Sequence, residues 1–376
     1  MKIFAVGGSV RDELLGLPVA DRDWVVVGAT PAELIAKGFR PVGSDFPVFL
    51  HPQTHEEYAL ARTERKTAPG YKGFVFHASP EVSLEEDLRR RDLTINAIAR
   101  GEDGALVDPH GGAADLRRGI LRHVSEAFAE DPVRILRVAR FAARFGFAVA
   151  PETMELMRAM VRSGEADHLV PERVWQEIAR GLQEPRPGRM LEVLRDCGAL
   201  ARVLPEVDAV TAREGPGPLA ARLEASTAFA LPVRFACLTV GLAPEAVMAL
   251  CERINAPVEC RDLAGVAARE RAAVEGAGAL GAEALLGLLE RTDAFRRPDR
   301  LERLMDVCEC DLRARGHSRQ VPRDRIRAAR AAALEVDAAA IARQNPQSVP
   351  AAIHAARAAR IGDALPGSRA QKKAPG

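Results

Sequence analysis

The stretch Gly7-Gly8-Ser9-Val10-Arg11-Asp12, followed by Asp21-Arg22-Asp23, carries the strongest signal in this chain. The glycine pair comes directly after the apolar run Ile3-Phe4-Ala5-Val6, which is typical of a buried strand. Because glycine has no Cβ, backbone N–H groups at such a turn come close to a polyanion. Arg11 adds a planar fork of donors that suits phosphate oxygens. These residues predict a phosphate-binding turn between a strand and a helix.

The two carboxylates of this stretch stand two positions apart and lead into the predicted strand Trp24–Val27. Side chains at positions i and i+2 of a strand point to the same face of the sheet. Two hard oxygen ligands beside a phosphate-binding turn suit Mg²⁺ that holds a nucleoside triphosphate. A glycine turn alone, or an Asp-x-Asp alone, is more often ordinary loop structure. Their order predicts nucleotidyl transfer, with Asp21 and Asp23 as catalytic and metal-binding residues.

Residues 7–27 resemble the signature of the class II tRNA nucleotidyltransferase and poly(A) polymerase superfamily, in which GG-x-V-R-D-x-L-L-G precedes D-x-D. The match continues through Leu14-Leu15-Gly16. The resemblance implies a nucleotidyltransferase head of the polymerase-beta type. It also implies that Gly8 and Arg11 bind the nucleotide.

Length and composition limit the remaining possibilities. A chain of 376 residues is expected to form about two or three domains. No apolar run approaches a membrane span, and the start of the chain lacks a signal-peptide pattern, so we expect a cytoplasmic protein. The net charge of +1 requires that any nucleic acid be held by local basic patches. The six cysteines include no C-x-x-C pair and are expected to be buried free thiols.

The predicted fold class is α+β, with a nucleotidyltransferase head over residues 1–118 that contains a small mixed sheet. Ser83 and Glu86 form a capping-box pattern before one of its helices. The predicted strands are Phe4–Val6, Trp24–Val27, Val48–Leu50, Tyr58–Ala61, Ile95–Ala99 and Leu106–Val107. The predicted helices are Val10–Leu15, Pro31–Lys37 and Leu84–Arg89.

Strand signals fade after Asp115, and apolar residues then recur at helical spacing. We expect a helical neck over residues 119–205, a helical body and tail over 206–366, and a disordered end over 367–376. The predicted neck helices are Pro132–Phe145, Pro151–Arg162, Pro171–Leu182 and Gly188–Cys197.

A second motif, Arg89-Arg90-Arg91-Asp92, precedes an apolar segment of the head. Charge runs at helix ends are commonly solvated faces. The run resembles the R-R-D motif of the same superfamily, which implies that Arg91 and Asp92 contact the ribose and phosphates of the nucleotide. A carboxylate that accepts from a ribose hydroxyl would favour ribonucleotides.

The third motif lies in Glu130–Phe141, where Asp131, Arg134, Arg137 and Arg140 recur at every third position. On a helix of 3.6 residues per turn they lie along one side. A charged face of a surface helix is the ordinary interpretation of this pattern.

The same segment resembles the E-D-x-x-R motif of the superfamily, in which an Asp and an Arg serve as a protein template for the incoming base. The resemblance assigns that role to Asp131 and Arg134, and nucleotide contacts to Arg137 and Arg140. A carboxylate accepts from the exocyclic amines of C and A, and a guanidinium donates to their ring acceptors. U and G present the opposite pattern and should be rejected.

Further segments resemble supporting parts of the same enzymes. Asp108–Leu116 is similar to the hinge between head and neck, and Thr63–Thr67 with Gly70–Gly73 is similar to the flexible loop that assists the change from CTP to ATP. Pro171–Glu177 is similar to a helix-stabilising motif, so its charged residues are expected to form structural ion pairs. Glu57 is a weaker candidate for a third carboxylate near the metals, and surface charge is its more common meaning.

The segment Phe49–Lys66 resembles the proteobacterial subgroup of CCA-adding enzymes that includes the multifunctional CCA proteins. Members of that subgroup often carry a C-terminal HD phosphohydrolase domain, which needs His and Asp metal ligands. This chain has no histidine between His168 and His317. Phe235–Gly241 stands where the His-Asp pair would lie, so phosphatase and phosphodiesterase activities are expected to be absent.

The sequence therefore predicts a CCA-adding nucleotidyltransferase that uses CTP, ATP and Mg²⁺ and grips the acceptor and TΨC arms of tRNA with its helical tail. A poly(A) polymerase, or an enzyme that adds only CC or only A, remains an alternative within the superfamily. A tRNA-binding protein without catalysis is the alternative from another class. The oligomeric state, monomer or dimer, stays open.

Overall fold

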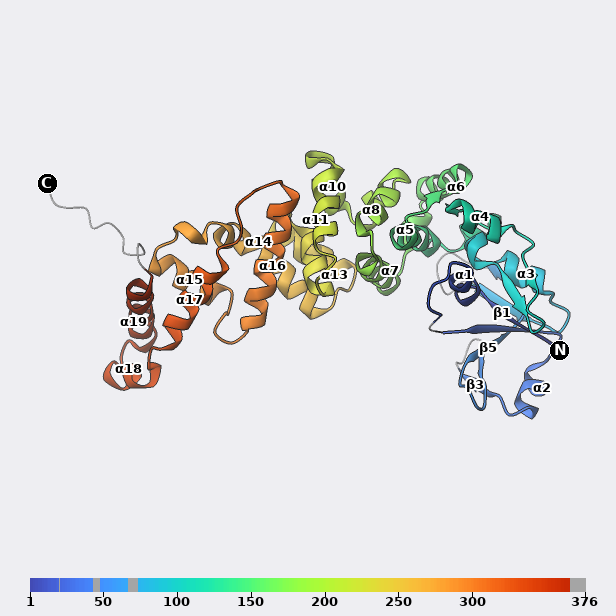
Figure 1. Ribbon diagram of the computed structural model, residues 1–376, viewed down its shortest axis with the longest axis horizontal. Helices are drawn as coiled ribbons and strands as arrows, with labels where there is room; N and C mark the ends of the chain where they lie inside the picture. The colour runs from blue at the N-terminus through green and yellow to red at the C-terminus, as the bar shows by residue number, and fades with distance from the viewer. Residues whose placement is uncertain (20, 43–47, 67–73, 366–376) are drawn as a thin grey trace. The chain divides into compact units, whose positions relative to one another are not determined.

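The computed structural model describes residues 1–19, 21–42, 48–66 and 74–365. Its internal contacts divide the chain into two compact units, Met1–Pro205 and Glu206–Gly376. The first unit holds every strand in the described part of the chain, and the second is helical where it is described (Figure 1). The mixed head and helical remainder confirm the predicted α+β class. The predicted disorder at 367–376 lies outside the described residues.

The head is built on a seven-stranded mixed sheet in the order β3-β4-β5-β2-β1-β8-β9. β2 and β5 run parallel, and the other neighbouring pairs are antiparallel. A separate antiparallel pair, β6 and β7, flanks residues 67–73, so the predicted flexible loop lies partly outside the described residues. The strands are β1 (Lys2–Val6), β2 (Asp23–Val27), β3 (Arg40–Val42), β4 (Val48–Leu50), β5 (Glu57–Leu60), β6 (Arg62–Lys66), β7 (Phe74–Ala78), β8 (Ala99–Gly101) and β9 (Leu106–Val107).

Successive side chains of a strand point to opposite faces of the sheet, and both faces of this sheet pack against helices. Val25 belongs to the apolar cluster that includes Leu88 of α3, whereas its neighbour Val26 belongs to the cluster that includes Leu34 of α2. Asp23 lies on the same face as Val25, because the two are separated by two positions of β2. The head helices are α1 (Gly8–Leu14), α2 (Pro31–Ala36), α3 (Leu84–Arg89) and α4 (Gly112–Arg118).

The prediction of one strand over Ile95–Ala99 is wrong. Residues Thr94–Asn96 form a 3₁₀ turn, and the strand β8 begins only at Ala99. The Thr94 hydroxyl donates to Asp115 at 2.8 Å, and the N–H of Ala97 donates to the carbonyl of Thr94. These hydrogen bonds stabilise the turn, and Asn96 lines the same pocket as Asp23.

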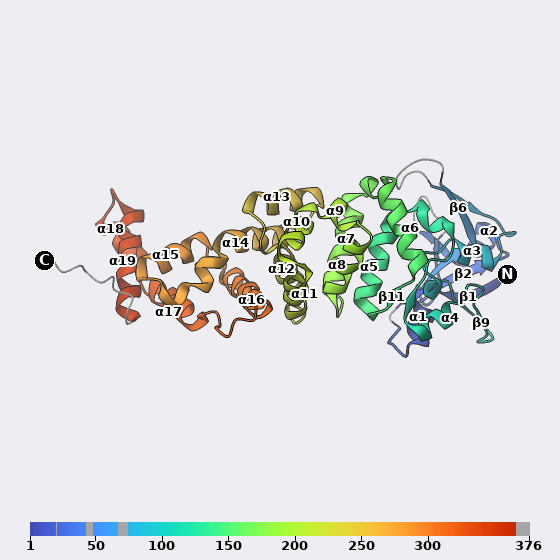
Figure 2. The ribbon, with the colours of Figure 1, turned by 90° about the horizontal axis from the view of Figure 1, so that it is seen from above.

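The rest of the first unit is a set of helices in which α5, α7 and α8 pack against one another, as Figures 1 and 2 show. The four predicted neck helices are present: α6 has its predicted ends, and the other three differ by one residue at one or both ends. A short parallel pair of strands, which the sequence pattern did not indicate, joins the segments before and after α5. The elements are β10 (Ile120–Leu121), α5 (Val133–Phe145), β11 (Ala148–Val149), α6 (Pro151–Arg162), α7 (Pro171–Gln183), α8 (Pro187–Asp196) and α9 (Leu200–Val203).

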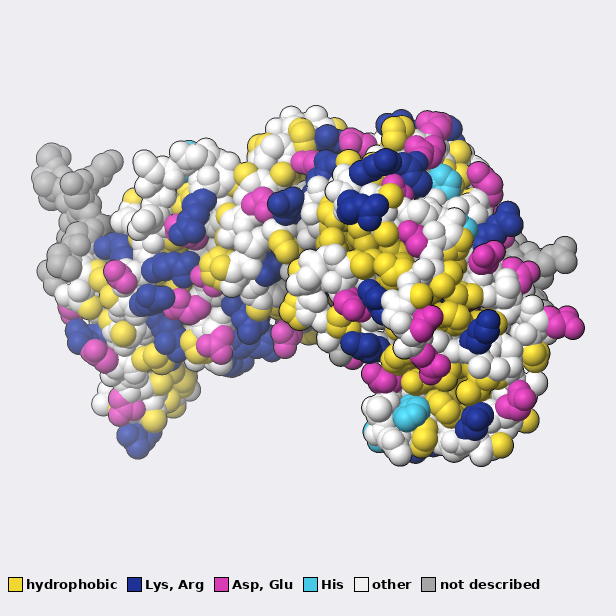
Figure 3. Space-filling view, turned by 45° about the vertical axis from the view of Figure 1, so that its right-hand side comes forward, with side chains coloured by type: hydrophobic (Ala, Val, Ile, Leu, Met, Phe, Trp, Pro, Cys, Tyr) yellow, Lys and Arg dark blue, Asp and Glu magenta, His cyan; other side chains and the backbone are white. Residues whose placement is uncertain are grey.

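The second unit is a helical array, and several of its helices begin with proline in the first turn, where no N–H partner is needed. On the face drawn in Figure 3, basic and acidic side chains are interspersed over the surface. None of the helices described is long and apolar enough to cross a membrane. The helices are α10 (Pro205–Glu214), α11 (Pro216–Ala225), α12 (Leu231–Thr239), α13 (Pro244–Arg253), α14 (Val258–Glu275), α15 (Ala282–Arg291), α16 (Pro298–Ala314), α17 (Arg323–Leu334), α18 (Ala338–Gln344) and α19 (Val349–Ala364).

A buried ion pair lies in the core of the second unit, next to the segment predicted to replace the His-Asp pair. Arg222 donates to Asp311 at 2.7 Å and to the carbonyls of Cys237 and Val240 at 3.4 Å. Both charged side chains are almost fully buried. The positive charge beside this carboxylate therefore comes from an arginine. The predicted loss of phosphatase and phosphodiesterase activity stays a prediction.

Candidate active site

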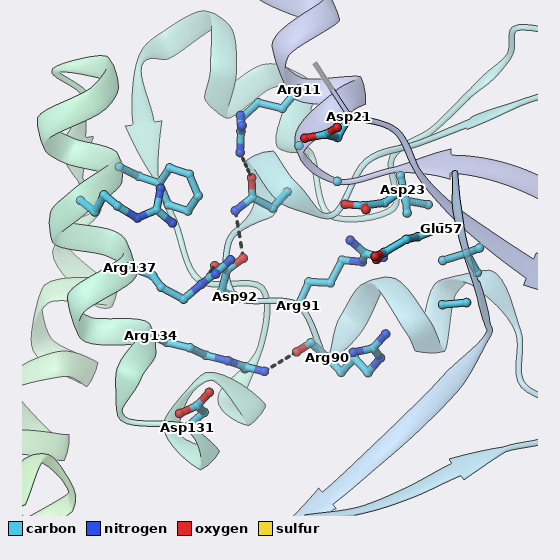
Figure 4. A pocket seen from close by; sticks show the side chains of 18 of the residues that line it. Arg11, Asp21, Asp23, Glu57, Arg90, Arg91, Asp92, Asp131, Arg134 and Arg137 are labelled. Atoms are coloured by element: carbon cyan, nitrogen blue, oxygen red, sulfur yellow. Dashed lines mark hydrogen bonds and ion pairs between the residues drawn. The ribbon is translucent and has the colours of Figure 1, made fainter. Parts of the chain in front are cut away.

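A pocket of about 810 Å³ lies in the first unit, between the sheet of the head and helix α5. We call it the arginine-lined pocket (Figure 4). Among its lining residues ten are arginines and five are carboxylates, so its charge is strongly positive. The arginines are Arg11, Arg62, Arg90, Arg91, Arg134, Arg137, Arg140, Arg144, Arg173 and Arg180, and the carboxylates are Asp21, Asp23, Glu57, Asp92 and Asp131.

Asp21 and Asp23 line one side of this pocket, although only Asp23 belongs to β2 and Asp21 precedes the strand. Glu57 lines it as well, because parallel pairing of β2 with β5 places Glu57 in register with Asp23. Its side chain is exposed, so both the surface-charge interpretation and the role near the metals stay open. Within the described residues, no three His, Cys, Asp or Glu side chains form a metal-binding group.

The glycine turn brings the backbone close to an arginine. Gly7 has a φ of +71°, which favours glycine, and Gly8 begins α1. A Cβ at Gly7 would lie 2.8 Å from Nη1 of Arg91, which is closer than carbon atoms tolerate. A side chain at this position would therefore displace Arg91 from the turn.

Arg11 is buried and held from several sides. Its Nε donates to Asp12 at 2.8 Å, and its Nη1 donates to Oδ1 of Asn96 at 2.5 Å. Its Cζ lies 5.1 Å from the ring centres of both Phe141 and Phe145 on α5. Burial lowers the pKa of Arg11, although Asp12 acts against this effect. The guanidinium is thus a fixed cation at the border of head and neck.

The two arginines of the R-R-D segment share one acidic partner. Arg90 and Arg91 both pair with the buried Asp87, at 2.6 and 3.2 Å. The Nε of Arg91 is buried, and no hydrogen-bond partner for it lies among the described residues. The two arginines are therefore oriented by Asp87 within the arginine-lined pocket.

Asp92 is buried and forms an ion pair across the pocket. Its Oδ2 accepts from Nε of Arg137 at 2.7 Å, and its Oδ1 accepts from Leu93 N–H and from the amide of Asn96. Burial alone would raise the pKa of Asp92, but the charge of Arg137 and the hydrogen bonds hold it well below the ordinary range. This carboxylate ties the head to α5, and its predicted ribose contact stays a prediction.

The two residues predicted to read the base are each fixed by a neighbour. Asp131 accepts from both Nη atoms of Arg173, at 3.0 and 2.8 Å. Arg134 is buried and donates to the carbonyls of Ala127 and Arg90, at 2.8 and 2.7 Å. Arg173, which the sequence placed among purely structural ion pairs, therefore holds a pocket residue.

Two further arginines of α5, Arg140 and Arg144, pair with carboxylates. Arg140 is buried, and its Nε donates to Glu177 at 2.6 Å, which is the kind of structural pair predicted for that motif. Arg144 donates to Asp12 at 2.9 Å and so forms another bridge between α5 and the head. Asn96 is a pocket residue that sequence reasoning missed, as are Arg144 and Arg180. A buried polar residue four positions after Asp92 was the available signal.

The comparisons with known families agree with this geometry. Residues 3–122 match the family described as the poly A polymerase head domain, and residues 146–211 match the one described as the probable RNA and SrmB-binding site of polymerase A. The multifunctional CCA protein of Azoarcus sp. is 55% identical, over 96% of this chain and 97% of its own length. That of Chromobacterium violaceum is 54% identical, over 96% and 98%.

Solved structures give the same relation. The CCA-adding enzyme of Bacillus stearothermophilus in complex with CTP is 27% identical, with a TM-score of 0.66, over 96% of this chain and 89% of that one. The CCA-adding enzyme of Thermotoga maritima complexed with tRNA is 22% identical, with a TM-score of 0.55, over 83% and 74%. The second likeness shows a shared fold alone.

The buried Asp92 gives the first unit an acid-sensitive stability. Since the folded pKa lies below the unfolded value of about 3.9, the unfolded chain takes up the extra proton, and stability falls as the pH falls through about 4. We expect Asp92→Asn to be less stable than wild type at pH 7 but to lose less stability between about pH 5 and pH 3. Urea unfolding followed by tryptophan fluorescence reports on this unit, because both tryptophans, Trp24 and Trp175, lie in it.

The exposed carboxylate variant Glu81→Gln serves as the control and should keep the wild-type pH dependence. An Asp92→Asn protein whose stability falls with pH as steeply as wild type would contradict this assignment.

Proposed function

The chain belongs to the family of the multifunctional CCA proteins, and we propose that its arginine-lined pocket joins CMP and AMP units to tRNA. The protein is an enzyme that adds the CCA sequence to the 3′ end of tRNA. One observation carries the assignment of the site. The carboxylates Asp21 and Asp23 and the residues Asp131 and Arg134 lie on opposite sides of one pocket, which therefore holds a nucleotide by both its ends.

The donor set on the carboxylate side fits Mg²⁺. Magnesium in such sites takes one or two carboxylates and completes its shell with phosphate oxygens and water. Asp21 and Asp23 would hold it, and Glu57 stands next to Asp23 as a further acidic neighbour. When bound, the cations would lower the pKa of the RNA 3′-hydroxyl and neutralise the leaving pyrophosphate.

The residues of the glycine turn and the R-R-D segment orient the triphosphate for the transfer. The backbone of Gly8 and the guanidinium groups of Arg11 and Arg91 face the position of the phosphates. The 3′-oxygen of the RNA forms a bond to the α-phosphorus, the bond from that phosphorus to the bridging oxygen breaks, and pyrophosphate leaves. The proton of the hydroxyl passes to solvent. Asp92 keeps its position behind the ribose through Arg137.

Base choice follows from the two residues on the other side. A carboxylate has about four acceptor positions, so Asp131 still accepts from an exocyclic amine while Arg173 holds it. Arg134 is held by two carbonyls and donates to the ring acceptors of C or A. No nucleic-acid template is then needed. Arg137 and Arg140 complete this side of the pocket, with Arg137 the more exposed of the two.

The helical unit offers a place for the RNA backbone. A second pocket of about 470 Å³ lies where α14 and α16 begin. Its lining includes four arginines, Arg296, Arg297, Arg300 and Arg303, and three carboxylates, Glu259, Asp262 and Asp299. Guanidinium groups at helix N-termini favour phosphate, and we assign the acceptor and TΨC arms of tRNA to this unit. The six cysteines are buried free thiols, which fits a reducing cytoplasm.

Labelled CTP and ATP, supplied separately and together with tRNA that lacks CCA, test this function. We expect two CMP units with CTP alone and the complete CCA end only with both nucleotides. Addition of AMP to unstructured RNA would indicate a poly(A) polymerase, and addition of only CC or only A would indicate a partial enzyme. Binding of tRNA without any incorporation would leave a non-catalytic tRNA-binding protein.

The carboxylate Asp23 should be indispensable for the chemical step. Removal of a metal ligand eliminates stabilisation of both the nucleophile and the leaving group, so Asp23→Asn should lower kcat by about 10³-fold or more. Single-turnover incorporation of CMP measures the effect. Glu81→Gln, an exposed carboxylate of the same unit, should keep wild-type activity. An Asp23→Asn enzyme within tenfold of wild type would remove this residue from the metal site.

Arg134 should control which base is accepted. Arg134→Ala removes the donor to the ring acceptors of C and A, so the preference for CTP over UTP should fall by about tenfold or more. The ratio of kcat/KM for the two nucleotides measures it. The exposed Arg117→Ala serves as the control for loss of one positive charge. Unchanged discrimination against UTP would exclude Arg134 from base reading.

A further inference from the structure

Asn96 is the one amide side chain among the lining residues of the arginine-lined pocket, and its position is unusual. It ends the 3₁₀ turn Thr94–Asn96 and is 6% exposed. It stands between an arginine of the triphosphate side and the carboxylate that is paired to α5. A buried amide in such a place has to satisfy both of its polar atoms.

The neighbours of Asn96 determine how its amide is oriented. Arg11 only donates hydrogen bonds, so the amide oxygen faces it, at 2.5 Å. Asp92 as a carboxylate only accepts, so the amide nitrogen faces it, at 3.0 Å. Neither a carboxylate nor an apolar side chain makes both contacts. The site therefore demands one donor and one acceptor on the same short side chain.

The contacts form a continuous chain from α1 to α5. Arg11 donates to Asn96, Asn96 donates to Asp92, and Asp92 accepts from Arg137 at 2.7 Å. Figure 4 labels the other three members, Arg11, Asp92 and Arg137. Arg137 lies one helical turn from Arg134, so this series of hydrogen bonds ends on the base-reading segment of α5.

A second set of contacts also connects Arg11 to α5, and it does not involve Asn96. The guanidinium of Arg11 also rests between Phe141 and Phe145 of α5. These ring contacts are less directional than hydrogen bonds and hold Arg11 near α5 without setting the rotation of its donors. Asp12 holds Nε and Nη2 of Arg11, and the amide oxygen of Asn96 accepts from the remaining Nη1.

We propose that Asn96 is a positioning residue that couples the triphosphate-holding Arg11 to the base-reading helix α5. The inference rests on the proposed function of the pocket. Removal of the amide loosens Arg11 and leaves one oxygen of Asp92 with one donor fewer. Binding of the phosphates then no longer fixes the position of Asp131 and Arg134 relative to the base. Selection between C or A and U or G should suffer together with triphosphate binding.

The test compares Asn96→Ala with a control on the same turn. Thr94 is equally buried and donates to Asp115 at 2.8 Å, but it does not line the pocket. Thr94→Val therefore removes one buried hydrogen bond without breaking the chain. Both variants should lower the melting temperature, but only Asn96→Ala should change base selection. Asn96→Asp, which keeps the shape of the side chain, provides a second variant in case Asn96→Ala does not fold.

The readouts are KM for CTP and the ratio of kcat/KM for CTP over UTP on tRNA that lacks CCA. We expect Asn96→Ala and Asn96→Asp to raise KM and to lower the ratio, each by about tenfold. Because the residues act in series, Arg137→Ala should add little to the loss of discrimination already present in Asn96→Ala.

Loss of stability in both Asn96→Ala and Thr94→Val with discrimination intact would overturn the proposal and leave Asn96 a structural residue. Fully additive effects of Asn96→Ala and Arg137→Ala would overturn the coupling. Failure of the wild-type enzyme to incorporate CMP would instead refute the proposed function. The two kinds of failure are therefore distinguishable.

Discussion

The ion pair between Asp92 and Arg137 is the constraint on which the geometry of the pocket depends. Asp92 follows α3 in the head, whereas Arg137 lies on α5, so the contact sets the separation between the triphosphate side and the base side. Asp92 is buried whereas Arg137 is 35% exposed, so removal of Arg137 would leave a buried carboxylate without its cation, which is the costly way to break such a pair. The bond from Arg144 to Asp12 and the bond from Arg134 to the carbonyl of Arg90 bridge the same two parts. The pocket is therefore held at a fixed width by interactions that its own residues supply.

The excess of arginine in the pocket would be unstable without partners, and the structure shows how it is tolerated. Arg91 forms an ion pair with Asp87, Arg140 with Glu177, and Arg173 with Asp131. Each guanidinium is thus oriented before a nucleotide arrives, which reduces the entropy that binding has to overcome. The carboxylates compensate only part of the positive charge, so the site as a whole still attracts a polyanion.

Much of this arrangement could be predicted from sequence, because glycine turns, apolar alternation and helical spacing are local signals. They located the strand before Gly7, the capping box at Ser83 and the helix that carries Arg134. The turn at Thr94–Asn96 was missed, since Leu93–Ala99 is apolar enough for a strand and the turn is stabilised by residues distant in sequence, such as Asp115 and Arg11. The place of Glu57 beside Asp23 could not be predicted, because it follows from the pairing of β2 with β5, which no local pattern contains. The contact of Arg173 with Asp131 likewise joins residues that are far apart in the chain.

The central claim is that the protein alone, through an α5 held by buried ion pairs, presents a surface that distinguishes bases. Calorimetric titration of the full chain with CTP, ATP, UTP and GTP in the absence of RNA tests it most directly. The account predicts that CTP and ATP bind at least about tenfold more tightly than UTP and GTP, a difference of about 1.4 kcal/mol. Equal affinities for the four nucleotides without RNA would show that selection arises elsewhere, and would contradict the account.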